Sequence, residues 1–347
     1  MKTEEFGKTK EGRQVTKYTI SNQNGMKMSV IDLGATIQSV KMKNKEGKEL
    51  DLVLGYDDPK DYQNYTFYFG AAIGRNANRI DQAEVTLDGK KVTLEQNDNE
   101  NNLHSGSKGF HAVLWTLEKS DDHSMTFSYL SKDGEQDFPG NMQAEVTYTL
   151  NDENEIEISY HAVSDKETVA NFTNHSYFNL NGHDSGYVEN QELEILASYF
   201  TPVKNSKSIP TGEIVKVSGT PMDFRNMKRI GEEIGADYQQ IVYAGGYDHN
   251  YVLDKADGTM QLAARAMSKE SGITMDVYTD CPGIQFYSGN FITDHQGKEG
   301  VEYGFRQGFC LETQYFPNAV NEEQFEAPVL KPGEEYVSAT KYSFKAV

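Results

Sequence analysis

The chain has 347 residues and carries 33 Lys and Arg against 53 Asp and Glu, a formal net charge of −20 at pH 7. Such a charge repels phosphate backbones and anionic lipid, so we expect neither nucleic acid nor a membrane as a partner. The excess is uneven, because residues 1–50 carry +4 and the remainder −24. Ten basic residues spread over these fifty are typical of a solvated face. Aromatic residues make up 11%, with 30 Gly and 9 Pro, which excludes disordered and collagen-like classes.

The two cysteines, Cys281 and Cys310, are too few for a disulfide framework, so we expect free thiols. The N-terminal stretch MKTEEFGKTKEGR has no apolar core of a signal peptide. No apolar run approaches the roughly 20 residues that span a bilayer. These observations predict a cytoplasmic protein.

The first elements along the chain are strands. Residues 17–43 predict two or three of them, and residues 57–62 (DDPKDY) predict a short capped helical turn with an early proline. Residues 85–94 alternate apolar and polar side chains around Asp88-Gly89, a pair that supplies the positive φ of a tight hairpin turn.

The clearest alternation lies in the middle of the chain. Residues 142–150 and 156–162 predict a hairpin with one buried face, joined by the turn Asn151–Asn154. Residues 224–236 predict one short helix. Residues 273–279 and 336–344 predict two further strands.

The order of these elements excludes the common nucleotide-binding folds. It contains no alternation of strands and helices, no G-x-G-x-x-G and no P-loop. We therefore predict an all-β protein: one large antiparallel domain over residues 1–347, built as layered sheets.

Six polar segments interrupt the strand pattern and are candidate site segments. If the segment Asn171–Leu180 is extended, Thr173, His175, Tyr177 and Asn179 share one face, which suits a sugar because it offers polar partners and a ring. Residue types alone leave ordinary alternatives open, such as solvated arginines, a histidine bonded to backbone or a turn aspartate. The segments are Gly74–Ile80, Asn101–Gly106, Asn171–Leu180, Gly245–Tyr251, Cys281–Asn290 and Phe309–Asn318.

Glu312 lies within an apolar strand pattern, where a glutamate is disfavoured. Burial would raise the pKa of its carboxyl toward neutrality, as a general base requires, whereas a solvent-facing strand position is the alternative. Histidine is the usual proton carrier near neutral pH. The sequence has no H-x-H, no H-E-x-x-H and no close Cys/His cluster, so we expect no metal.

Taken together, the segments resemble the aldose 1-epimerase (galactose mutarotase) family. Six motifs occur in family order between about residue 5 and the C-terminus, and Ser105 departs from the Gly that many members have after the histidine. The resemblance implies a galactose mutarotase-like β-supersandwich with few short helices. It also implies cofactor-free interconversion of the α and β anomers of free aldohexoses such as galactose and glucose. The motifs are GRNANRI (74–80), Leu103-His104, NHSYFNL (174–180), Asp248-His249-Asn250, PGIQFYSGN (282–290) and LETQYFPN (311–318).

The resemblance also implies residue roles. Glu312 matches the general base that removes the proton of the anomeric hydroxyl, and His175 matches the general acid that protonates the ring oxygen. His104 matches a second histidine near that oxygen. The positions that hold the sugar hydroxyls match Asn78, Arg79, Asp248 and Gln285. We expect attraction between Glu312 and His175 to lower the carboxyl pKa and raise the imidazole pKa, and the rate to follow a bell-shaped pH profile.

Three alternatives remain open at this point. A glycoside hydrolase would use Asp248 and Glu312 as its carboxylate pair. A hexose-6-phosphate epimerase on the same fold would need a cationic phosphate clamp, for which Arg75 and Arg79 are the nearby arginines. The third is a non-catalytic sugar-binding protein.

Overall fold

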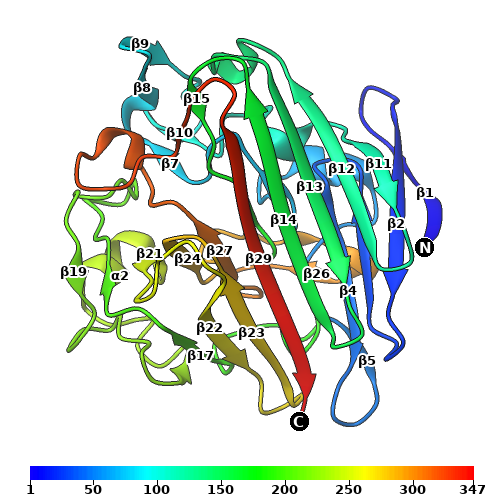
Figure 1. The fold of residues 1–347 in the computed structure, drawn as a ribbon. Coiled ribbons are helices and arrows are strands. Elements are labelled where there is room, and N and C mark those ends of the chain that lie inside the picture. The colour runs from blue at the N-terminus through cyan, green and yellow to red at the C-terminus, as the bar shows by residue number, and fades with distance from the viewer.

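The computed structural model describes residues 1–347 and consists mainly of antiparallel strands (Figure 1). It has only two short α-helices, α1 (Pro59–Asn64) and α2 (Gln239–Ala244). The expectation of an all-β protein with layered antiparallel sheets and few helices is confirmed. None of the helices has the length and apolar character that crossing a membrane requires.

The largest sheet has nine strands and forms the long diagonal face in Figure 1. It contains the predicted hairpin, and the C-terminal strand lies beside it. In spatial order the strands are β11 (Thr116–Ser120), β12 (Ser124–Ser131), β13 (Met142–Leu150), β14 (Glu155–Ser164), β29 (Glu335–Ala346), β23 (Ile273–Thr279), β22 (Gln261–Met267), β17 (Glu192–Ile195) and β20 (Lys228–Arg229).

Two five-stranded sheets complete the layers. The N-terminal sheet is a meander of β1 (Lys2–Lys8), β2 (Gln14–Ser21), β3 (Lys27–Ile31), β4 (Thr36–Lys43) and β5 (Glu49–Asp51). The other has the spatial order β19 (Val215–Lys216), β18 (Tyr199–Phe200), β21 (Asp248–Val252), β24 (Gly283–Tyr287) and β27 (Cys310–Gln314). A core of 57 buried residues draws side chains from all three sheets, so burying apolar surface holds the layers together.

Five two-stranded pairs lie outside these three sheets. Two of the pairs contain residues of the candidate site segments named in the sequence analysis. The pairs are β6 (Ala72–Ile73) with β16 (Thr173–Asn174), β7 (Arg79–Ile80) with β10 (Asn102–Leu103), β8 (Glu84–Leu87) with β9 (Lys90–Thr93), β15 (Thr168–Val169) with β28 (Val329–Leu330), and β25 (His295–Gln296) with β26 (Glu302–Tyr303).

The predicted hairpins and strands are confirmed. In β13 and β14 residues buried in the core alternate with more exposed ones, as a sheet with one buried face requires. Asp88 and Gly89 both have positive φ, 49° and 69°, and join β8 to β9. The early proline begins α1, and the Asp58 carboxylate accepts from the Lys60 N–H at its start.

The predicted helix over residues 224–236 is wrong. This segment contains β20, which pairs with β17 at the edge of the nine-stranded sheet, and turns. Phe224 and Ile230 are both fully buried, a spacing that does not form the stripe of a helix. Sheet pairing therefore outweighs the weak local preference for a helix. The helix of this region begins only at Gln239.

Candidate active site

The predicted site residues gather around one cleft of about 420 Å³. They come from separate parts of the chain, since β7, β10, β21, β24 and β27 each supply a lining side chain. The cleft is lined by Asn78, Arg79, His104, His175, Asp248 and Glu312, together with Thr66, Phe67, Tyr68, Asp98, Leu103, Tyr177, Ser206, Ser208, Tyr287 and Phe291. A neighbouring hollow of about 590 Å³ shares Thr66 and Tyr68 with it but contains none of the predicted residues.

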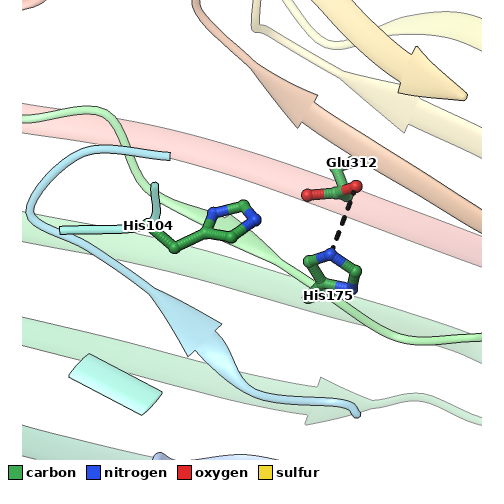
Figure 2. Close-up of side chains that lie close together, drawn as sticks. All are labelled: His104, His175 and Glu312. Atoms are coloured by element: carbon green, nitrogen blue, oxygen red, sulfur yellow. Dashed lines mark ion pairs between the residues drawn. The ribbon is translucent and has the colours of Figure 1, made fainter. Parts of the chain in front are cut away.

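Glu312 and His175 form the centre of the site (Figure 2). Glu312 lies in the middle of β27, and His175 follows β16 directly. The His175 Nε2 lies 3.6 Å from the Glu312 Oε1, and the two side chains are 6% and 3% exposed. The second carboxyl oxygen of Glu312 is buried without a hydrogen-bond partner. The pair therefore has an acceptor atom left for a ligand.

Burial decides the protonation chemistry of this pair. It raises the pKa of the Glu312 carboxyl, and the nearby Asp248 raises it further while Arg79 opposes this. Burial lowers the pKa of His175 to about 3. The expectation that mutual attraction would lower the carboxyl pKa and raise the imidazole pKa is wrong, because desolvation of both charged forms is the larger effect.

His104 is held in a defined orientation beside this pair. Its Nδ1 accepts a hydrogen bond of 3.1 Å from the backbone N–H of Asn78, so the proton of the neutral ring is on Nε2. Burial and the neighbouring His175 and Arg79 keep its pKa low, and the ring stays neutral. His104 is thus a hydrogen-bond donor, and its ring lies 5.2 Å from that of His175.

Ser105 takes part in the tight turn of the His104 loop. Both His104 and Ser105 have positive φ, 52° and 67°. The Ser105 hydroxyl accepts a hydrogen bond of 2.7 Å from the backbone N–H of Asn76. This contact fixes the loop conformation that a side chain otherwise disfavours.

The polar wall of the cleft is a chain of charged and amide groups. The Arg79 Nε donates to Asp98 at 2.7 Å, and its Nη1 lies 4.0 Å from the Asp248 carboxylate. Gln285 donates to Asp248 at 2.7 Å and is paired with Glu312 across β24 and β27. Gln285 therefore lies against Asp248 and is not among the residues that line the cleft.

Two lining residues carried no signal in the sequence. Asp98 lies in a polar loop that resembles any solvated segment, and only the fold places it against Arg79. Tyr68 has a positive φ of 60°, and its ring packs 4.7 Å from His104 and 5.7 Å from His175. Their roles depend on contacts with distant parts of the chain, which local patterns do not encode.

Arg75 does not belong to the cleft. It is 2% exposed and donates to the Ser131 side chain and to the carbonyls of Pro139 and Gly140. The nomination of Arg75 for a phosphate clamp is therefore wrong, because its guanidinium is taken up by buried carbonyls and does not line the cleft.

The same three central side chains have the composition of a metal site. One ligand atom each of His104, His175 and Glu312 lies within 4.8 Å of the others. The hydrogen bond from Asn78 places the His104 proton on Nε2, however, and a protonated nitrogen offers no lone pair to a metal. The arrangement favours proton transfer and hydrogen bonding to a polar ligand.

The fold and the site together indicate a class of protein, one that moves protons on a small hydroxylated ligand. The features that indicate it are a buried Glu–His pair, a histidine that donates a hydrogen bond, and a polar wall, all carried by antiparallel sheets. Comparison with known proteins agrees. The family model described as Aldose 1-epimerase matches residues 16–343. Galactose mutarotase of Sus scrofa is 41% identical over 340 residues, covering 98% of this chain and 97% of the relative. Aldose 1-epimerase of Escherichia coli K12 is 38% identical and covers 97% of each chain.

Solved structures agree as well. An aldose epimerase homologue from C. elegans superposes with a TM-score of 0.87 at 31% identity, covering 95% of this chain and 99% of that one. Galactose 1-epimerase from Lactobacillus acidophilus gives a TM-score of 0.85 at 27% identity, covering 99% and 98%. The chain belongs to the aldose 1-epimerase family and has its galactose mutarotase-like β-supersandwich. It is an isomerase that interconverts the α and β anomers of aldoses.

Proposed function

We propose that this enzyme opens and recloses the ring of free aldohexoses, galactose and glucose among them, with Glu312 as general base and His175 as general acid. The observation that carries the proposal is the buried contact of 3.6 Å between these two side chains. The names of the relatives, galactose mutarotase and aldose 1-epimerase, support galactose as a substrate.

The reaction needs one proton removed and one delivered. The Glu312 carboxylate takes the proton of the C1 hydroxyl, the C1–O5 bond breaks, and the protonated ring of His175 gives its Nε2 proton to O5 and becomes neutral. The open aldehyde rotates about C1–C2 and recloses on its other face with both transfers reversed. Acid and base contribute about 10²–10⁴-fold each, so the pair suffices without a metal or nucleotide.

Burial favours the neutral form of each group, so the reactive pair of a Glu312 carboxylate and a protonated His175 is a minor protonation state at neutral pH. A carboxyl whose pKa is raised is a stronger base when ionised, and an imidazole whose pKa is lowered is a stronger acid when protonated. His104 Nε2–H is suited to donate to the ring oxygen. Arg79 with Asn78 and Asp248 are suited to hold the remaining hydroxyls, with Gln285 orienting the Asp248 carboxylate.

Polarimetry on freshly dissolved α-D-galactose, and then on α-D-glucose, tests the proposal. We expect the enzyme to speed the decay of optical rotation, and Glu312→Gln to lose about 10²–10⁴-fold in kcat because the amide cannot accept the proton. Glu302→Gln, an exposed carboxyl on β26, is the matched control. A Glu312→Gln enzyme with full activity would rule out this base.

The alternative activities are measured on the same samples. Release of reducing sugar from an aryl galactoside would identify a glycoside hydrolase, and anomer exchange on glucose 6-phosphate alone a phosphate-specific epimerase. Binding of galactose without faster anomer exchange would identify a sugar-binding protein.

We propose further that residues 1–347 act as one domain and that the protein is cytoplasmic. The core of 57 residues drawn from all three main sheets supports the first statement. The two free, buried thiols of Cys281 and Cys310 suit a reducing compartment and support the second.

A further inference from the structure

One aromatic side chain of the cleft contacts both histidines and has no role in the mechanism so far. The ring of Tyr68 lies 4.7 Å from that of His104 and 5.7 Å from that of His175, measured between ring centroids. Tyr68 lines the cleft and also the neighbouring hollow of about 590 Å³, so it forms part of the wall between them. A ligand that reaches the two histidines therefore also reaches Tyr68.

The backbone around Tyr68 is tied to the backbone of His175. Tyr68 has a φ of 60°, and its carbonyl accepts from the Ala71 N–H at 3.0 Å, which closes a turn. The Gly70 N–H donates to the His175 carbonyl, and the His175 N–H donates to the Ala71 carbonyl, both at 3.0 Å. A left-handed conformation is unfavourable for a bulky residue, and such residues concentrate at ligand sites. The hydrogen bonds of this turn hold the Tyr68 ring in the cleft in spite of its unfavourable φ.

The Tyr68 hydroxyl is a free donor, because it makes no hydrogen bond within the chain. Burial raises its pKa to about 12, the carboxylates of Asp98 and Glu95 add to this rise, and Arg79 opposes it. Since charges act most strongly on near groups, the hydroxyl lies toward the wall that contains Arg79 and Asp98, and it keeps its proton there. The carboxylates of this wall only accept hydrogen bonds, so Tyr68 supplies a donor that a sugar hydroxyl can use.

We propose that Tyr68 is a further substrate-binding residue, whose hydroxyl donates a hydrogen bond to a sugar hydroxyl away from C1, on the Arg79 side of the cleft. The inference rests on the proposed function, because it assumes a sugar whose C1 and ring oxygen lie at Glu312 and His175. The contacted sugar hydroxyl accepts from Tyr68 while it donates to a carboxylate of the wall, and hydrogen bonds in such a chain strengthen one another. Tyr68 thus adds a specificity contact to those of the charged wall.

Steady-state polarimetry on galactose tests the contact with a variant that keeps the ring. Tyr68→Phe removes only the hydroxyl, so we expect KM to rise about three- to tenfold, as for the loss of one neutral hydrogen bond, and kcat to change less than about twofold. Tyr65→Phe removes a hydroxyl from a tyrosine that lines only the neighbouring hollow, and it is the matched control. An unchanged KM in Tyr68→Phe would overturn the proposal.

Deoxygalactoses identify the contacted hydroxyl of the sugar. For the one of the 2-, 3-, 4- and 6-deoxy sugars that lacks this hydroxyl, we expect the wild type and Tyr68→Phe to have the same KM, because the two losses then remove the same interaction. The remaining deoxy sugars should keep the full difference between the two proteins. A difference that persists with every one of these sugars would overturn a contact with a hydroxyl away from C1.

Calorimetric titration of galactose into the wild type and into Tyr68→Phe tests the hydrogen bond without reference to turnover. We expect the variant to bind about three- to tenfold more weakly. If the wild type binds galactose but does not speed anomer exchange, weaker binding by the variant still supports the contact, while the proposed function is contradicted. Equal binding by two active proteins would overturn the contact and leave the proposed function standing.

Discussion

Arg79 shows how a single residue is prepared for a ligand. Its guanidinium is 13% exposed and lies between two carboxylates, those of Asp98 and Asp248. Both negative charges raise the pKa of Arg79, so it stays charged inside the cleft. Both carboxylates line the cleft, and Asp98 holds the Nε edge of the guanidinium from the loop that leads to β10. We infer that Asp98 orients Arg79 for binding and takes no part in proton transfer.

The variant Asp98→Asn tests this assignment. Loss of a hydrogen bond to a charged group costs about 1.5–3 kcal/mol, so we expect KM for galactose to rise by roughly tenfold or more. We expect kcat to change little, because Glu312 and His175 are untouched. Steady-state polarimetry gives both constants, and Asp237→Asn, at an exposed turn, is the control. A fall in kcat at constant KM would contradict the assignment.

The strands decide which side chains meet. β21, β24 and β27 are neighbours, and their register pairs Asp248 with Tyr287 and Gln285 with Glu312. A shift by one residue would turn Glu312 away from the cleft. The N-terminal sheet is tied to the η4 turn (Lys298–Gly300) by a buried ion pair, in which Lys298 Nζ donates to Asp51 at 2.7 Å and to the Gln38 carbonyl at 2.9 Å.

Removal of one partner of this ion pair is expected to destabilise the fold. Lys298→Met leaves the Asp51 carboxylate buried without its cation, which costs about 3–5 kcal/mol in the free energy of unfolding. The double variant Lys298→Met/Asp51→Asn removes both charges and should regain most of this loss. Urea unfolding gives the values. A double variant as unstable as the single one would show that packing, not charge pairing, explains the effect.

The whole molecule buries histidines that stay neutral. Burial lowers the pKa to about 4 for His111 and to about 3 for His175 and His249, and it lowers that of His104 as well. In the unfolded chain all four titrate near the ordinary value of about 6.5. Burial raises the pKa of four carboxyls, which act in the opposite direction: those of Asp32, Asp248, Asp280 and Glu312.

Acid should therefore destabilise the protein well above the pH at which carboxylates are protonated. A histidine whose pKa is lowered in the folded state stabilises the protein above its unfolded pKa, and this stabilisation is lost as the pH falls below that value. A carboxyl whose pKa is raised in the folded state has the opposite effect on the stability of the protein. With His183 and His295, six histidines have lowered pKa values and outnumber these carboxyls, so we expect a net uptake of protons on unfolding and a stability that falls as the pH drops below about 6.5. Scanning calorimetry from pH 7 to pH 5 checks this. If the chain unfolds as one domain, we expect a single transition at each pH. A midpoint independent of pH would contradict buried neutral histidines.

The sequence by itself determined the strands and the tight turn at Asp88-Gly89, whereas the membership of Glu312, His175 and His104 in one site was implied by the resemblance of its motifs to the aldose 1-epimerase family. Alternating burial and positive φ act between neighbours in the chain, so local patterns carry them. Only the tertiary structure decided that Arg75 is internal while Arg79, four residues later, faces the cleft. Only it placed residues 224–236 at a sheet edge, and burial reversed the expected pKa shifts of Glu312 and His175. Desolvation, sheet pairing and the packing of Tyr68 against His175 depend on groups brought together from distant parts of the chain, which no local pattern records.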